Sequence, residues 1–146
     1  MNQKVYFAGS IRGGRSDAAL YGRVIAHINQ TDMVLTEHIG DVHYSIETGN
    51  IPLDRRIYEQ DTGWLKKCDL VIAECSSPSL GVGYEMAYAE KLLKPVYIFC
   101  RKDAFLSAML TGDPYFHIYF YDNEEDLLTQ IDEILAERTQ KAEETK

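Results

Sequence analysis

Short β-prone runs alternate with longer helical segments along most of the chain, and this alternation limits the possible folds more than any other feature. The clearest run is Leu70–Ala73, a continuous apolar stretch of the kind that is buried on both faces of a parallel sheet. The expected strands are Val5–Ala8, Met33–Leu35, Leu70–Ala73, Val96–Cys100 and Ile118–Tyr121. Strands separated by helices imply a parallel sheet covered on both faces, with right-handed crossovers. The 146 residues therefore predict one α/β domain.

The segments between these runs have helical periodicity or helical end signals. The expected helices are Ala18–Ile28, Asp54–Lys67, Gly83–Leu93 and Glu124–Glu137, with a short helical piece at 106–110. Residues 37–52 are expected to form a functional loop, because compact domains seldom keep about 15 structureless residues otherwise. We expect the domain to span residues 1–137, and the charged end, 138–146, to be frayed.

Two loops rich in Gly and Ser follow the first and third expected strands. Open parallel sheets bind ligands beyond the carboxyl ends of their strands, where the strand order reverses. In a flavodoxin-like, doubly wound five-stranded sheet that point lies between these two strands. The stretches "AGSIRGGRSD" (8–17) and "SSPSLGVGYE" (76–85) are therefore expected to face one another.

The first of these stretches nearly matches the G-x-x-x-x-G-K-S/T phosphate loop of nucleoside triphosphatases, but Arg15 stands where the lysine is required. Three interpretations remain open. The stretch is a true triphosphatase loop, a plain glycine-rich turn, or a site for one phosphate. In the last case the ligands are Ser10, Arg12 and the backbone amides near Gly13 and Gly14.

The second stretch contains Gly81-x-Gly83, but Met86 stands where a dinucleotide fingerprint has its third glycine. A dinucleotide site is therefore only weakly supported. Hydroxyls and free amides ahead of a helix bind anions, and this segment supplies both. The hydroxyls belong to Ser76, Ser77 and Ser79.

Two carboxylates near these loops are candidates for chemistry. Glu85 lies just inside the expected third helix, where the helix dipole favours the ionised form that a nucleophile or base requires. The alternative is an ordinary N-terminal Glu on a solvated surface. Asp61 falls within the apolar stripe of its helix, where burial would raise its pKa and make it a general acid. The alternative is a position at the edge of that stripe, with a hydrogen bond to a neighbouring loop.

Charge and cysteine content exclude several classes of function. A net charge of −8 disfavours a nucleic-acid partner. The four His residues show no metal-ligand spacing, so we expect no metal. The three cysteines, Cys68, Cys75 and Cys100, lack C-x-x-C spacing and are expected to be reduced and buried. The longest apolar runs are far shorter than the roughly 20 residues of a membrane span. Because no signal-peptide pattern is present either, we expect a cytoplasmic or nuclear protein.

Taken together, these motifs resemble the 2'-deoxynucleoside 5'-phosphate N-hydrolases, which are related to the nucleoside 2-deoxyribosyltransferases. The matching stretches, in family order, are "YFAGSIRGGR" (6–15), "VLTEH" (34–38), "EQDTGWL" (59–65), "CDLVIAECSSPSLGVGYE" (68–85) and "LSAML" (106–110). The resemblance implies a flavodoxin-like homodimer without a cofactor. It also implies cleavage of deoxynucleoside monophosphates into free base and 2-deoxyribose 5-phosphate.

The resemblance also implies roles for individual residues. Glu85 matches the nucleophile, Asp61 the acid that assists departure of the base, and Tyr6 the tyrosine that orients the nucleophile. Positions matching the family's substrate-binding loops, which hold the 5'-phosphate, are Ser10, Ile11, Arg12, Gly13, Ser79 and Gly81. Ser107 and Met109 match a segment that the other subunit supplies.

Two other functions remain open on the sequence alone. One is exchange of bases by a nucleoside 2-deoxyribosyltransferase, and the other is a nucleotide-binding regulatory module without turnover. The sequence determines neither the preferred base nor whether ribonucleotides are rejected. Residues 39–53, which could contact the base, match no stretch of the family.

Overall fold

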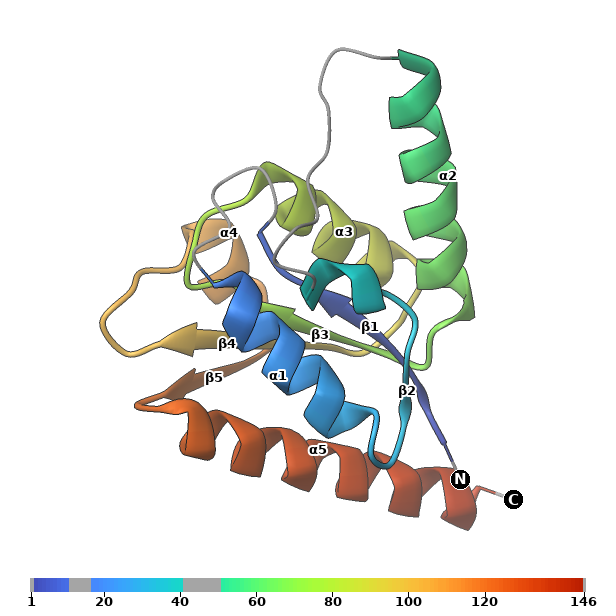
Figure 1. Cartoon of the computed structure of the whole chain (residues 1–146). Helices are drawn as coiled ribbons and strands as arrows, with labels where there is room; N and C mark the ends of the chain where they lie inside the picture. The colour runs from blue at the N-terminus through green and yellow to red at the C-terminus, as the bar shows by residue number, and fades with distance from the viewer. Residues whose placement is uncertain (1, 11–16, 41–50, 146) are drawn as a thin grey trace.

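The computed structural model describes residues 2–10, 17–40 and 51–145, and its centre is a parallel sheet of five strands (Figure 1). The strands are β1 (Lys4–Ala8), β2 (Met33–Val34), β3 (Leu70–Glu74), β4 (Val96–Arg101) and β5 (His117–Tyr121). Their order is β2-β1-β3-β4-β5, and every neighbouring pair is parallel. This is the flavodoxin-like order, so the predicted fold is confirmed.

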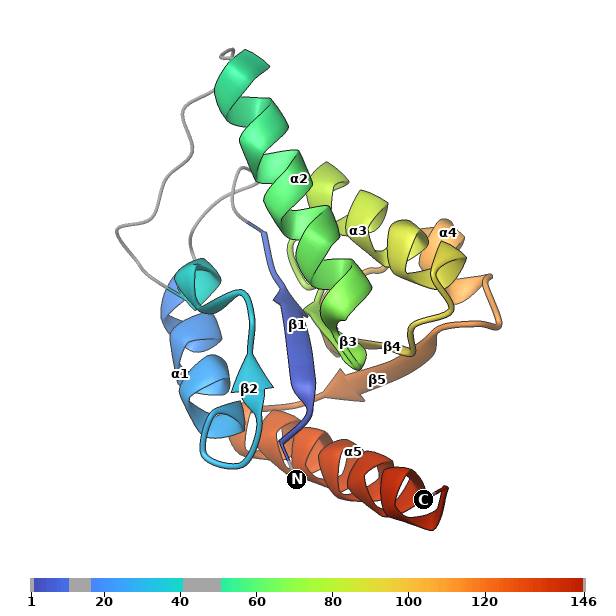
Figure 2. The ribbon, with the colours of Figure 1, turned by 90° about the vertical axis from the view of Figure 1, so that its right-hand side faces the viewer.

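Helices cover both faces of the sheet, as the doubly wound arrangement requires. One layer contains α1 and α5, and the other contains α2, α3 and α4 (Figures 1 and 2). Their bounds are α1 (Ala18–Ile28), α2 (Ile51–Lys67), α3 (Leu80–Lys91), α4 (Ala108–Thr111) and α5 (Glu124–Glu144). Alternation along β1 sends Val5 and Phe7 into the α1/α5 core and Tyr6 into the α2/α3 core.

Several predicted segments differ from the structure at their ends. The expected loop at 37–52 begins with a 3-10 helix, η1 (Glu37–Gly40), and ends where α2 starts at Ile51. Residues 41–50 lie outside the described part of the chain. Helix η1 packs directly on α1, because a Cβ at Gly40 would lie 2.6 Å from the Gly22 Cα. Glycine at both positions permits this close approach.

The last helix is longer than predicted, because it was expected to end at Glu137 and α5 continues to Glu144. Its last turns are held to the start of β1: the Gln3 side-chain amide donates to the Leu135 carbonyl at 3.1 Å and to the Thr139 hydroxyl at 3.0 Å. An ion pair at 3.0 Å between Glu137 and Lys141, which lie one helical turn apart, further stabilises this part of α5. The high charge of residues 138–144 therefore does not prevent them from forming part of α5.

The start of α3 also differs from the prediction, and this difference moves a candidate residue. The Ser79 hydroxyl accepts a hydrogen bond from the Val82 N–H at 3.2 Å, an N-cap that starts the helix at Leu80 rather than Gly83. Glu85 is consequently the sixth residue of α3 and lies in its second turn.

Candidate active site

Three of the predicted site residues come together between β1, α2 and α3. The Tyr6 side chain points from the middle of β1 into the α2/α3 layer and is 2% exposed. Its hydroxyl is hydrogen-bonded to the Glu85 carboxylate. Burial, followed by the charges of Glu85 and Asp61, raises the pKa of Tyr6 far above its ordinary value. Tyr6 is therefore a neutral hydrogen-bond donor to Glu85 at every physiological pH.

Glu85 does not have the readily ionised character that the helix dipole suggested. Burial, followed by the nearby charge of Asp61, raises its pKa to about 8, while the Tyr6 hydrogen bond acts in the opposite direction. The prediction is wrong because the dipole acts mainly within the first turn, whereas Glu85 lies in the second. Desolvation therefore determines its protonation.

Asp61 is half-buried, with Thr62 and Leu65 buried after it on α2. It lies at the border of the buried stripe, and burial raises its pKa to about 6, in the predicted direction. The Trp64 ring, one turn further along α2, packs at 5.5 Å between centroids on the His38 ring of η1. This contact brings η1 beside the same part of α2.

Glu85 and Asp61 share a proton over a defined pH range. With pKa values of about 6 for Asp61 and about 8 for Glu85, the pair carries one proton between these limits, and that proton lies mainly on Glu85. One carboxyl group can then donate a proton while the other is an anion. Enzymes that cleave glycosidic bonds commonly use such a pair, with one carboxyl group protonated and the other ionised.

We expect Glu85→Gln to stabilise the protein at alkaline pH. A raised folded-state pKa means that the stability contributed by neutral Glu85 is complete below its ordinary value of 4.5. That contribution is lost as pH rises through about 8. The melting temperature of the variant should exceed that of wild type by a margin that grows from pH 4.5 to pH 8 and then stays constant. Each kcal/mol of additional unfolding free energy should raise the melting temperature by about 2–4 °C. A margin independent of pH would contradict the assignment of this pKa.

The described end of the first glycine- and serine-rich stretch contacts the second stretch. The Ser77 hydroxyl donates to the Asp17 carboxylate at 3.3 Å, which joins the second stretch to the end of the first. Ser10 is fully buried, and its N–H donates to the Tyr21 hydroxyl at 3.2 Å. Ile11, Arg12 and Gly13 lie outside the described residues.

The amino end of α3 is open to a ligand. Gly81 is exposed, and a Cβ at that position would meet nothing closer than the Ser79 hydroxyl at 3.9 Å. The first amides of a helix have no partner within the helix and favour anions. Ser79 and Gly81 thus lie where an anionic group could approach the backbone.

Ser107 and Met109 belong to α4 and its cap, a different element from β1, α2 and α3, which carry Tyr6 and the carboxyl pair. Ser107 caps α4, its hydroxyl accepting from the Met109 N–H at 3.2 Å, and both residues are exposed. Among the described residues, no recorded hydrogen bond or ion pair joins α4 to Tyr6, Asp61 or Glu85.

Sequence reasoning missed a second polar cluster, which lies at the carboxyl ends of β3 and β4. Glu74 is 2% exposed and ends β3, Arg101 ends β4, and Asp17 precedes α1. The one available signal was a carboxylate directly after the apolar run Leu70–Ala73. Arg101 gave no signal, because its partner Asp17 is distant in sequence.

The predicted burial of the cysteines is confirmed, since Cys68, Cys75 and Cys100 are all buried and unpaired. Across residues 2–10, 17–40 and 51–145, no cluster of three or more His, Cys, Asp or Glu side chains is arranged to hold a metal ion. Over the same ranges, no helix combines the length and the apolar character needed to cross a membrane.

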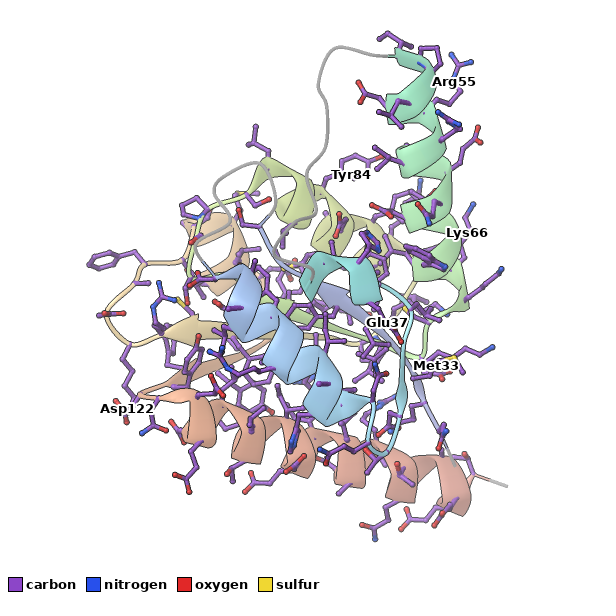
Figure 3. All side chains as sticks on the ribbon, viewed as in Figure 1. Met33, Glu37, Arg55, Lys66, Tyr84 and Asp122 are labelled. Carbon is purple, nitrogen blue, oxygen red and sulfur yellow. The ribbon has the colours of Figure 1, made fainter. Side chains whose placement is uncertain are left out.

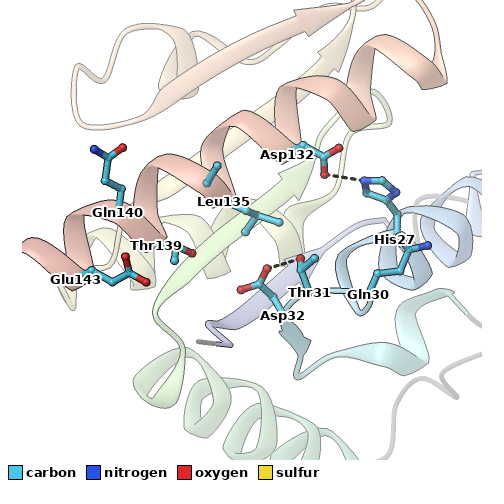
Figure 4. Close-up of a pocket in the computed structure, with 10 residues that line it drawn as sticks. His27, Gln30, Thr31, Asp32, Asp132, Leu135, Thr139, Gln140 and Glu143 are labelled. Atoms are coloured by element: carbon cyan, nitrogen blue, oxygen red, sulfur yellow. Dashed lines mark hydrogen bonds and ion pairs between the residues drawn. The ribbon is translucent and has the colours of Figure 1, made fainter.

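A separate hollow lies between α5 and the end of α1 (Figure 4). In it His27 contacts Asp132 at 2.7 Å between Nε2 and Oδ1. Because α1 runs away from the carboxyl edge of the sheet, its end lies at the opposite edge from the Tyr6–Asp61–Glu85 group. This hollow is therefore separate from that group.

Comparison with known proteins gives the chain a family. The sequence model of the nucleoside 2-deoxyribosyltransferase family matches residues 5–115. A 5-hydroxymethyl-dUMP N-hydrolase from Rattus norvegicus is 44% identical over 117 residues, which cover 74% of this chain and 68% of that protein. A protein of the same name from Tetraodon nigroviridis is 45% identical over 116 residues, covering 75% and 79%.

A solved structure with the same fold is a 2-deoxyribosyltransferase from Bacillus psychrosaccharolyticus, with a TM-score of 0.63 and 17% identity over 86% of this chain and 90% of that one. At this identity the likeness shows the fold alone, whereas the family model and the curated relatives show descent. The chain therefore belongs to the nucleoside 2-deoxyribosyltransferase family.

Proposed function

We propose that the protein hydrolyses the N-glycosidic bond of 2'-deoxynucleoside 5'-monophosphates, releasing free base and 2-deoxyribose 5-phosphate. The observation that carries this proposal is the Glu85–Asp61 pair, two partly buried carboxyl groups with raised pKa values that share one proton beside Tyr6. The names of the relatives from Rattus norvegicus and Tetraodon nigroviridis, both N-hydrolases of a deoxynucleotide, support hydrolysis over base exchange.

The reaction proceeds by double displacement. The reactive form is the minor one, in which the shared proton has moved from Glu85 to Asp61. In this form the Glu85 carboxylate attacks the anomeric carbon and forms a glycosyl ester, while the Asp61 carboxylic acid donates its proton to the departing base. Asp61, now a carboxylate, then takes a proton from water, whose oxygen attacks the same carbon and releases Glu85. The Tyr6 hydroxyl orients Glu85 and stabilises its anion, because a hydrogen bond to the charged form lowers the pKa of a carboxyl group.

The 5'-phosphate binds where the two glycine- and serine-rich loops meet. Its ligands are Ser10, Ile11, Arg12 and Gly13 from the first loop, with Ser79 and Gly81 at the amino end of α3. The exposed Gly81 and the amides of the first turn of α3 support this position, since phosphate groups bind at helix N-termini.

No cofactor takes part. We place the protein in the cytoplasm or nucleus because its free cysteines suit a reducing compartment.

The test of this function is release of base from deoxynucleoside monophosphates, followed by chromatography. Adding a second free base as acceptor distinguishes hydrolysis from exchange, because a transferase would form a new nucleotide. A regulatory module would instead be thermally stabilised by the nucleotide through binding linkage, yet release no base at high protein concentration. Base release that yields sugar phosphate, with no new nucleotide, is the outcome that we expect.

The active protein is a homodimer in this proposal, with Ser107 and Met109 reaching the neighbouring site. Large apolar side chains of α3, of α4 and of the segment before α4 are unusually exposed. They include Leu80 at 97%, Phe105 at 95% and Met109 at 80% exposure. A second copy would cover these side chains. Tyr84 of α3 lies on the side toward α2 instead, where its ring packs at 6.4 Å between centroids on the Tyr58 ring (Figure 3).

We expect Met109→Asp to convert the dimer to a monomer and to lower base release about tenfold or more, since a buried charge at an interface costs several kcal/mol. Leu93→Asp is the matched control, because Leu93 is equally exposed and follows the carboxyl end of α3. Sedimentation velocity and base release are measured on both variants. A wild-type monomer with full activity would disprove the dimer.

A further inference from the structure

Asp17 occupies the N-cap position of α1 but does not cap the helix. Asp is among the strongest N-cap residues, and its side chain usually accepts from an N–H of the first turn. Here no such bond is formed. The carboxylate instead accepts from the Ser77 hydroxyl at 3.3 Å and from the Arg101 guanidinium at 3.4 Å to each oxygen. The side chain is thus committed to other elements rather than to its own helix.

The segment that Asp17 contacts is itself fixed from two further sides. The Ser76 N–H donates to the buried Glu74 carboxylate at 2.6 Å. The Ser76 hydroxyl accepts from the Arg101 N–H at 2.9 Å. The loop between β3 and α3 is therefore anchored to β3, β4 and α1 immediately before Ser79 caps α3.

We propose that Asp17 is a positioning residue that holds the amino ends of α1 and α3 at the separation required for one phosphate group. This inference rests on the proposed function, which places the 5'-phosphate of the substrate between the loops leading into these two helices. Helix N-termini bind anions through backbone amides, so a change in the separation of the two helix ends would weaken phosphate binding. Asp17 acts through Ser77 and Arg101 and does not touch the phosphate itself.

Neutralising Asp17 distinguishes a positioning role from a purely electrostatic effect on phosphate binding. A carboxylate near a phosphate repels it, so removal of the charge alone would tighten the binding of anions. Arg101 offsets part of that charge and also lies 3.6 Å from Asp103. A positioning role predicts the opposite outcome, since loss of the Asp17 contacts lets the two helix ends separate. The two roles therefore differ in the sign of the effect on phosphate binding.

The experiment uses the full-length protein and 2-deoxyribose 5-phosphate as the probe. Calorimetry gives the Kd of the probe, and base release gives KM and kcat for a deoxynucleoside monophosphate. We expect Asp17→Asn to raise the Kd and the KM in parallel by about tenfold, with kcat within about twofold of wild type. Ser77→Ala, which removes a single neutral hydrogen bond, should raise both by about threefold to fivefold.

Glu124→Gln is the matched control. Glu124 pairs with Arg23 at 2.8 Å on the surface between α1 and α5, so this variant also neutralises a carboxylate in an arginine pair. Its Kd and KM should equal those of wild type. Ser77→Ala keeps Asp17 and its pair with Arg101, so it tests the link even if Asp17→Asn folds poorly.

A Kd for the probe that is unchanged or lowered in Asp17→Asn or in Ser77→Ala would overturn the positioning role, as would a fall in kcat at constant Kd. A wild-type protein that binds the probe but releases no base would disprove the proposed hydrolysis. The shift of Kd in the two variants would then still support the positioning role. Failure of the wild-type protein to bind the probe would contradict both proposals.

Discussion

Glu85→Gln is expected to lower kcat for base release by about 10³-fold or more, because an amide cannot form the glycosyl ester. Glutamine keeps the size of the side chain and can still accept the hydrogen bond from Tyr6. The KM and the Kd of 2-deoxyribose 5-phosphate should therefore change little. Single-turnover base release at saturating nucleotide measures the loss at the chemical step.

The matched control for this variant is Glu90→Gln. Glu90 lies on the same helix and interacts with Asp113, away from the carboxyl pair. It should retain the wild-type kcat. Equal base release by wild type and Glu85→Gln would remove Glu85 from the mechanism, and an equal loss in both variants would indicate damage to α3 instead.

Asp61→Asn is expected to lower kcat by about 10²- to 10³-fold, since general acid catalysis contributes on this scale. Asparagine cannot protonate the departing base or activate the water that follows. The Glu85 nucleophile remains, so slow release should persist, in contrast to Glu85→Gln. The measurement is the initial rate of base release across pH 4.5 to pH 9.5.

The pH profile provides a second test of Asp61. In wild type the active form of the pair carries one proton, so the rate should rise with pH near 6 and fall near 8. In Asp61→Asn only Glu85 must lose its proton, and its pKa is lower once the Asp61 charge is gone. Residual activity should then rise with pH and stay constant above neutrality. A variant that keeps the alkaline fall would show that Asp61 is not the acid.

The positions of the strands could be predicted because short apolar runs record burial on both faces of the sheet, whereas the strand order came from the resemblance to a flavodoxin-like family. Leu70–Ala73 and Val96–Cys100 are buried almost throughout, and no polar residue interrupts their pattern. The helix ends were predicted less well, because they depend on particular side-chain bonds. Ser79 starts α3 by capping it, and Gln3 holds the last turns of α5 to β1.

The identity of the carboxyl pair followed from family motifs, but its protonation could not be predicted from sequence. The pKa of Glu85 depends on burial among elements far apart in the chain and on the charge of Asp61. Its position in α3 alone suggested the opposite direction. The contact of Asp17 with Arg101 was missed for the same reason, since it forms only when α1 and β4 meet at one edge of the sheet.

The most direct test of the account is a product analysis of wild type and Glu85→Gln incubated in parallel with a panel of 2'-deoxynucleoside 5'-monophosphates. Chromatography measures free base, and mass spectrometry measures 2-deoxyribose 5-phosphate. We expect wild type to form the two products in equal molar amounts from at least one nucleotide, and Glu85→Gln to form almost none. Absence of base release by wild type above the protein-free blank, or the same low release by both proteins, would contradict it.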